Sequence, residues 1–233
     1  MKFWVGTSGY SYKEWKGTFY PEKLPDKEML NYYSEKLQAV EINNTFYRMP
    51  KESMLENWAE QVPKNFQFAL KASRRISHQK RLKEVEGETE YLFKTAATLE
   101  KRLGVILFQF PPYFRKNMER LENFLQLLPE GSHSAFEFRH ESLFDEELYD
   151  CLKKKNCALC LSDTAEKPIK KLTSTANWGY LRLRKMDYND NELKEWAKRI
   201  KSEKWESAFV FFKHEDEGAG PKMAARFLEI AEN

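Results

Sequence analysis

The sequence has few cysteines and no long hydrophobic run. Its three cysteines, at positions 151, 157 and 160, are too few and odd in number for a disulfide scaffold, which favours a reducing compartment. The amino-terminal residues lack the apolar run of a signal peptide, and no stretch is long enough to span a bilayer. We therefore expect a cytoplasmic protein that does not enter a membrane.

Several motifs of well-known chemistries are also missing. The segment Gly6-Thr7-Ser8-Gly9 lacks the third glycine of a dinucleotide-binding turn, and no phosphate-cradling P-loop occurs. Neither the His-Glu-x-x-His zinc motif nor the Gly-x-Ser-x-Gly nucleophile elbow is present. Cys157 and Cys160 lie three positions apart on an expected strand, so they face opposite sides, and no second pair follows. These patterns predict no cofactor and no metal.

The charge of the chain is nearly balanced. Among 233 residues, 39 Lys and Arg face 36 Asp and Glu, which gives a net charge of +3, and 41% of residues are hydrophobic. This composition excludes a disordered chain and falls well short of a strongly basic nucleic-acid-binding protein. A barrel of this length forms one unit, so we expect a single domain over residues 1–233.

Short apolar runs alternate with amphipathic segments from end to end. The expected strands cover residues 3–8, 39–43, 66–71, 104–110, 135–139, 158–163, 180–184 and 209–213. Helical spacing of apolar residues is clearest in 92–103, 118–128 and 193–200. This alternation predicts an α/β fold with about eight parallel strands, and the missing dinucleotide turn favours a TIM-type (β/α) barrel over an open sheet. Residues 164–177 show no helical pattern, so the helix after the sixth strand is expected to be weak or missing.

Polar residues recur near the carboxyl ends of five expected strands. Val40 and Ile42 are expected to face helices, which turns Glu41 and Asn43 toward the barrel axis. The same alternation in the other strands turns five more polar residues inward, namely Lys71, Gln109, Glu137, Arg139 and Arg182. Barrel enzymes place their chemistry at this end. An internal ion-pair layer that only stabilises the barrel is the alternative, and the two interpretations are compatible.

Two loop segments have an unusual composition. Residues 10–21 contain five aromatic side chains, which could stack on a sugar or base or could fold over the barrel mouth as a hydrophobic lid. Residues 71–83 form a basic run around His78 that could attract phosphate, although a solvated charged loop explains it as well. The acidic segment 214–218 offers carboxylate ligands, or it is a charged loop before the last helix.

These blocks resemble the YecE-like proteins, known as domain of unknown function 72. The matching segments are residues 6–12 with Trp15, Gly17 and 19–21, residues 40–47 with Pro50, Lys71 with 76–78, 109–112, 137–140, Asp163 and 180–182. The resemblance spans almost the whole chain and implies an α/β barrel with these blocks gathered at one end, but it implies no reaction. Two segments depart from the family pattern, residues 184–185 and 212–214, and both add positive charge to the mouth.

Our leading hypothesis is an enzyme, a hydrolase or an isomerase, that acts on a small anionic or polyhydroxylated substrate such as a phosphorylated one. The catalytic candidates are Glu41, Glu137, Lys71, His78 and Asp163, with the two glutamates as acid and base. The substrate-binding candidates are Ser8, Tyr10, Tyr12, Trp15, Asn43, Asn44, Tyr47, Gln109, Arg139 and Arg182.

Three alternatives stay open at this point. A metal-assisted hydrolase or isomerase would use Glu41, Glu137, Asp163 and His78, although nearby cations would repel the metal. A nucleic-acid or nucleotide-binding module would use the basic run, but the small net charge does not favour it. In the third alternative the charged layer only stabilises the fold. The sequence leaves the substrate and the oligomeric state open.

Overall fold

The structure, a computed structural model, describes residues 1–213 and 218–232. Its parallel strands pair in chain order and close into a barrel, because β8 returns to pair with β1. The strands are β1 (Lys2–Ser8), β2 (Ala39–Ile42), β3 (Gln67–Lys71), β4 (Leu103–Gln109), β5 (Ser134–Glu137), β6 (Ala158–Asp163), β7 (Trp178–Leu183) and β8 (Ser207–Phe212). The expected TIM-type barrel is confirmed. Most of the acidic segment 214–218 lies outside the described residues.

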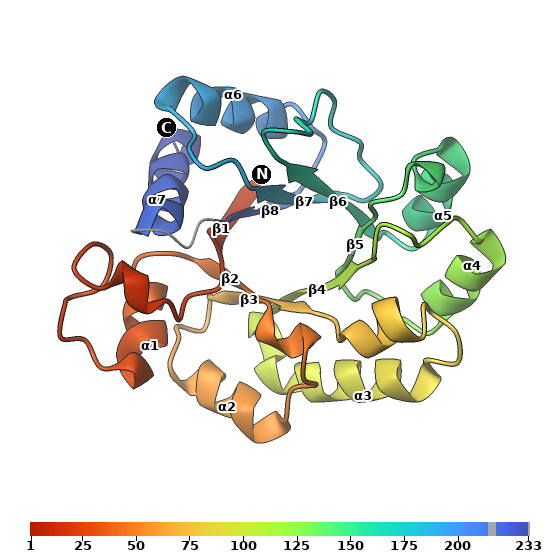
Figure 1. The fold of residues 1–233 in the computed structure, drawn as a ribbon, viewed down its shortest axis with the longest axis horizontal. Coiled ribbons are helices and arrows are strands. Elements are labelled where there is room, and N and C mark those ends of the chain that lie inside the picture. The colour runs from red at the N-terminus through yellow and green to blue at the C-terminus, as the bar shows by residue number, and fades with distance from the viewer. Residues whose placement is uncertain (214–217, 233) are drawn as a thin grey trace.

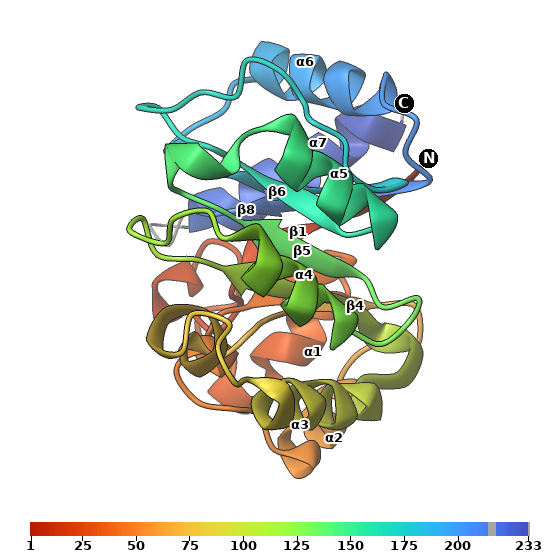
Figure 2. The same cartoon turned by 90° about the vertical axis from the view of Figure 1, so that its right-hand side faces the viewer.

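Helices surround the barrel on the outside (Figures 1 and 2). Those of the described chain are α1 (Met29–Ser34), α2 (Glu52–Glu60), α3 (Glu86–Ala96), α4 (Met118–Gln126), α5 (Glu146–Lys154), α6 (Asp190–Lys201) and α7 (Ala219–Glu232). The start of α4 follows from its sequence, since Asn117 Oδ1 accepts a hydrogen bond from the Arg120 backbone N–H at 2.9 Å. Its apolar residues then recur on the face that packs against the barrel.

No helix connects β6 to β7, as the sequence predicts, and an irregular crossover takes its place (Figure 1). Hydrogen bonds from side chains hold this crossover in position. The Asp163 carboxylate accepts from the Ile169 backbone N–H at 2.9 Å and from the Tyr188 hydroxyl at 2.7 Å. The Thr175 hydroxyl accepts from one backbone N–H of β6 at 2.7 Å and donates to a carbonyl just before that strand at 2.8 Å.

Two hydrophobic layers make up the core. The larger layer lies between the strands and the helices, and it includes Cys157. The smaller layer fills the barrel and consists of Ala39, Ala69, Val105, Leu107, Ala135, Ala158, Cys160, Trp178, Tyr180, Phe209 and Phe211. Cys157 and Cys160 therefore belong to different layers, as expected from their spacing. These apolar side chains fill the barrel below the carboxyl ends of the strands. The inward-facing polar residues lie at those carboxyl ends.

Five expected strands extend beyond the carboxyl ends of the observed ones. For β2, β5 and β7, which end at Ile42, Glu137 and Leu183, the consequence is that Asn43, Arg139 and Arg184 lie at the start of the following loops. The alternation of polar and apolar residues continues past the last pairing of the ladder, which is why the sequence pattern does not mark where each strand ends.

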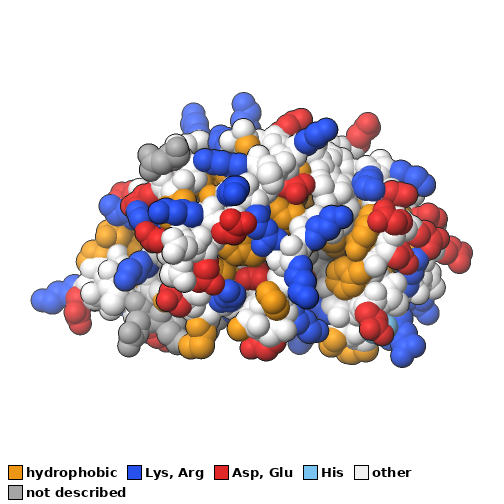
Figure 3. Space-filling model, turned by 90° about the horizontal axis from the view of Figure 1, so that it is seen from above, with side chains coloured by type: hydrophobic (Ala, Val, Ile, Leu, Met, Phe, Trp, Pro, Cys, Tyr) orange, Lys and Arg blue, Asp and Glu red, His pale blue; other side chains and the backbone are white. Residues whose placement is uncertain are grey.

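Charged side chains of both signs are mixed over the face seen from above in Figure 3, which agrees with the nearly balanced composition. In the described part of the chain, no helix is both long enough and apolar enough to cross a membrane.

Candidate functional site

Arg182, on β7, joins two carboxylates at the carboxyl end of the barrel. Its Nη1 donates to Glu137 Oε2 at 2.7 Å, and its Nη2 donates to Glu41 Oε1 at 2.8 Å. Glu41 is fully buried, and Glu137 and Arg182 are 2% and 3% exposed. One guanidinium thus connects β2, β5 and β7 across the inside of the barrel, and all three side chains face inward, as the strand alternation predicted.

Neutral side chains complete the hydrogen bonds of both carboxylates. The Tyr180 hydroxyl donates to Glu41 Oε2 at 2.8 Å, and Asn43 Nδ2 donates to Glu41 Oε1 at 3.1 Å. Gln109 Nε2 donates to Glu137 Oε2 at 2.7 Å. Buried charges with this many partners are held rigidly, because any displacement would leave a charged group unsatisfied.

The environment keeps both glutamates ionised. Burial raises the pKa of Glu41, but Arg182 and the Tyr180 hydroxyl outweigh it and hold that pKa below its usual value. Burial also raises the pKa of Glu137, but Arg182 and Arg139 bring it down to about 2. A pair that divides acid and base roles needs pKa values shifted in opposite directions. Here both are lowered, so neither glutamate carries a proton to donate near neutral pH.

Lys71, at the end of β3, lies near this pair but does not bond to it. Its Nζ is 4.1 Å from the ring centroid of Phe46, and its side chain is largely buried, with the residue 9% exposed. Within the described residues, Nζ makes no hydrogen bond and no ion pair. Burial and the charge of Arg182 lower the pKa of Lys71 to about 8, although the two glutamates partly oppose this shift.

His78 lies beside Lys71 in a short π-helix, Arg75–Gln79, of a kind often found at functional sites. Its ring meets the Phe46 ring edge-on at 4.8 Å between centroids, and its Nδ1 is 2.9 Å from the Ser77 hydroxyl. Burial and the charge of Lys71 lower the pKa of His78 to about 4. The imidazole is therefore neutral at physiological pH, unlike the cations around it.

Cations outnumber carboxylates among the described residues of this cluster. Arg139, with a side chain 38% exposed, faces Glu137 Oε1 at 3.4 Å. Arg184 is half-buried and has further contacts, and the charges around it include those of Arg182, Glu137, Arg139 and Glu41. Within the described chain, four cations (Lys71, Arg139, Arg182 and Arg184) thus lie near two carboxylates. We call these six residues, together with Tyr180, Gln109, Asn43 and His78, the mouth cluster.

One protein family matches almost the whole chain, including the segments that carry the mouth cluster. The model of a family described as "Protein of unknown function DUF72" matches residues 4–233. The chain belongs to the DUF72 family. Its expected resemblance to YecE-like proteins is thereby confirmed.

Two bacterial proteins share part of the sequence, and a solved structure shares the fold. UPF0759 protein YunF of Bacillus subtilis is 28% identical over 156 residues, 63% of this chain and 54% of YunF. UPF0759 protein YecE of Escherichia coli K12 is 30% identical over 116 residues, 49% of this chain and 43% of YecE. The matched segments thus span about half the length of these relatives. A crystal structure of a DUF72 family protein from Thermotoga maritima covers 100% of both chains with a TM-score of 0.85 and 26% identity.

Asp163 lies outside the mouth cluster of this DUF72 protein. It shares the parity of Leu159 and Leu161, whose side chains pack in the layer between strands and helices, and its carboxylate holds the crossover after β6. Because alternate residues of a strand face the same side, the sequence of β6 already indicated that Asp163 faces the helices. Among the described residues, no three His, Cys, Asp or Glu side chains are grouped as a metal site requires. The four ligands of the metal-assisted hypothesis therefore do not come together.

The aromatic loop after β1 packs mainly on itself. Trp15 is fully buried, with Tyr12 4.7 Å and Phe19 5.8 Å from it between ring centroids, so its ring is not available to a ligand. The Tyr12 hydroxyl donates to the Ser8 carbonyl at 2.8 Å, and Tyr10 is half-buried. Most of these rings anchor the loop to α1.

The remaining binding candidates differ in exposure. Ser8 is buried, and its side chain helps to lower the pKa of Glu41. Asn44 is exposed, and Tyr47 is 69% exposed with the Arg74 guanidinium 5.9 Å from its ring centroid. In the basic run, Arg75 and Lys80 both pair with Glu88, at 2.7 and 2.9 Å, which offsets part of its charge.

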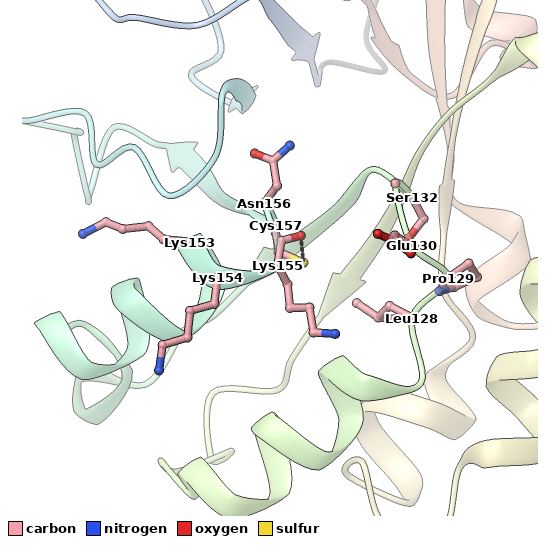
Figure 4. A pocket seen from close by; sticks show the side chains of 10 residues that line it. Leu128, Pro129, Glu130, Ser132, Lys153, Lys154, Lys155, Asn156 and Cys157 are labelled. Atoms are coloured by element: carbon pink, nitrogen blue, oxygen red, sulfur yellow. Dashed lines mark hydrogen bonds between the residues drawn. The ribbon is translucent and has the colours of Figure 1, made fainter.

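A cavity at the opposite end of the barrel contains none of the predicted site residues. It has a volume of about 540 Å³ and lies between the loops before β5 and β6 (Figure 4). Lys153 and Lys154 point away from the loop that carries Ser132, and Lys153 pairs with Asp150 at 2.8 Å. No converging polar groups of the mouth cluster's kind are found there.

Two members of the mouth cluster, Tyr180 and Arg184, were not predicted as site residues, and neither was Phe46, which contacts Lys71. Tyr180 and Arg184 have the same parity as Arg182, so the strand alternation contained a signal for both. Phe46 follows β2 in a short 3-10 helix, Asn44–Phe46, and no spacing rule links it to Lys71.

Proposed function

We propose that this protein is an enzyme that binds a small anionic substrate, such as a phosphorylated or carboxylated one, at the carboxyl end of its barrel. The observation that carries the proposal is the excess of positive charge among the described residues of the mouth cluster, where Lys71, Arg139 and Arg182 surround two glutamates. Confining like charges in a buried setting is unfavourable, and a bound anion relieves it.

The cations have different roles in this proposal. The two terminal nitrogens of Arg182 pair with the two glutamates, so Arg182 has a fixed position at the base of the site. Arg139 is the accessible guanidinium, and its planar fork suits two-point contact with phosphate or carboxylate. Asn43 and Asn44 at the rim are placed to hydrogen-bond hydroxyl groups of a polyhydroxylated substrate.

Proton transfer in this site belongs to Lys71 and His78 rather than to the glutamates. Both carboxylates stay ionised, whereas burial and nearby cations bring the pKa of Lys71 to about 8. A group whose pKa lies close to the working pH transfers protons most effectively. This assignment fits an isomerase or a hydrolase, and it leaves Glu41 and Glu137 as fixed negative charges that orient Arg182.

Anion binding is tested by calorimetric titration of the full chain with inorganic phosphate, glucose 6-phosphate and glucose. We expect phosphate and glucose 6-phosphate to bind, and Arg139→Ala to weaken both by about tenfold, because an exposed charged hydrogen bond is lost. Asp163→Asn serves as the control, since Asp163 lies outside the mouth cluster and should leave both affinities unchanged.

Two results would overturn the proposal. The first is the absence of any anion binding in the millimolar range, and the second is binding that Arg139→Ala does not alter. Single-stranded oligonucleotides titrated at two salt concentrations form a further arm of the test. Steeply salt-dependent binding of these alone would favour the nucleic-acid-binding alternative.

A further inference from the structure

Lys71 is the only buried lysine among the described residues. Lys16, Lys80 and Lys185 are partly exposed, and each donates to a carboxylate within 3.1 Å. Lys71 Nζ instead lies over the Phe46 ring at 4.1 Å, with no hydrogen bond or ion pair in the described chain, although the residue is only 9% exposed. A nearly buried ammonium without a paired carboxylate is destabilised, and the charges of Glu41 and Glu137 offset this only in part, so the site lowers the pKa of Lys71.

We infer that Lys71 is an amine nucleophile that forms an imine with the carbonyl group of a small anionic aldehyde, ketone or oxo acid. The inference rests on the proposed function, because it requires an anion to enter the mouth cluster. It adds the chemical class of the substrate and the atom that attacks it.

The neighbouring charges support a free amine at ordinary pH. Burial and Arg182 bring the pKa of Lys71 to about 8, so about half of the molecules carry an unprotonated Nζ at pH 8. An exposed lysine, with a pKa near 10.4, is unprotonated in well under about 1% of molecules at that pH. Lysines that are desolvated and placed beside another cation are the ones that proteins use for imine chemistry.

The reaction balances without any further reactant. The lone pair of Lys71 Nζ attacks the carbonyl carbon, a C–N bond forms, and the carbonyl π electrons pass to oxygen, which takes up a proton. The resulting carbinolamine loses water as the nitrogen lone pair forms the C=N bond and Nζ gives up its proton. One amine and one carbonyl compound therefore give one imine and one water.

The surroundings of Lys71 fit both ends of such a substrate. Arg139, whose side chain is 38% exposed, offers positive charge to its phosphate or carboxylate. His78, which contacts the same Phe46 ring, is neutral because burial and Lys71 lower its pKa to about 4. A neutral imidazole can both accept and donate a proton, which the addition and the loss of water require.

Borohydride trapping tests the inference directly. The full chain is incubated at pH 8 with pyruvate, with glyceraldehyde 3-phosphate or with uncharged glyceraldehyde, and sodium borohydride then reduces any imine to a stable secondary amine. Peptide mapping by mass spectrometry locates the adduct. We expect Lys71 to be modified by at least one anionic probe about tenfold or more above any other lysine and above its labelling by glyceraldehyde.

Matched variants separate this chemistry from general lysine reactivity. Lys71→Arg keeps the charge and should abolish the dominant adduct, whereas Lys64→Arg changes an exposed lysine and should not. If Lys71→Arg fails to fold, the mapping on the unchanged protein still decides the question. Equal labelling of many lysines, or no adduct with either anionic probe, overturns the inference. If phosphate still binds in that case, the proposed function stands and only the imine chemistry fails.

Discussion

Arg182 Nη1 lies 2.7 Å from Glu137 Oε2, although the two residues are 45 positions apart in the sequence. The same guanidinium reaches Glu41, 141 positions away, at 2.8 Å. These contacts make the two interpretations of the charged layer compatible: the ion pairs stabilise the barrel, and they also form a rigid floor beneath Lys71 and Arg139. The glutamates hold the arginine in place, and the remaining cations face the mouth.

Removing Arg182 should strongly destabilise the fold. Arg182→Met leaves two buried carboxylates without their shared cation, and we expect the free energy of unfolding to fall by about 3–5 kcal/mol. Urea denaturation at pH 7 measures it. The control is Arg226→Met, which breaks an exposed pair with Asp190 and should have a much smaller effect. Similar small losses in both variants would contradict a stabilising role for the buried layer.

Glu137 should make stability sensitive to acid. Its pKa of about 2 in the folded protein is below the ordinary value of 4.5, so the unfolded chain takes up its proton first as the pH falls. The stabilisation is present above pH 4.5 and is lost as the pH falls through about 2. We expect Glu137→Gln to be less stable than the unchanged protein at pH 7 by on the order of 3 kcal/mol, and this difference to shrink toward pH 2. Urea denaturation at several pH values checks this, and a constant difference would rule it out.

Lys71 should make stability rise with pH in the alkaline range. Its pKa of about 8 lies below that of an unfolded lysine, so between these values the unfolded chain binds more protons and stability rises with pH. Lys71→Met lacks this contribution. We expect the stability of the unchanged protein relative to Lys71→Met to increase by about 1–3 kcal/mol from pH 7.5 to 9.5. A difference that is independent of pH would show that Lys71 titrates as an ordinary lysine.

Gly6 should tolerate no side chain, because β1 and β2 approach closely there. A Cβ at this position would lie 1.7 Å from the Ala39 carbonyl oxygen, so Gly6→Ala must push the strands apart. We expect a loss of about 3 kcal/mol in urea denaturation. Gly87, in α3, has no atom within 4 Å of such a Cβ, and Gly87→Ala should stabilise the protein by about 0.5–1 kcal/mol. Equal effects in the two variants would refute this account.

The sequence alone was enough to assign the barrel of parallel strands with its helices and the missing helix after β6. It also placed Glu41, Glu137 and Arg182 on the inward side of their strands. All of this follows from local rules, because side chains alternate along a strand and recur every three to four residues along a helix.

Only the tertiary structure decided what these residues do to one another. Arg182 could have paired with either glutamate, and the strand alternation could not show that it pairs with both. Nor could it show that Lys71 lies over the Phe46 ring without an ion pair to any described residue. The protonation state of each carboxylate depends on its burial and on the cations within a few ångströms. Those distances are set by how eight strands close into a barrel, and closure is a property of the whole chain rather than of any segment.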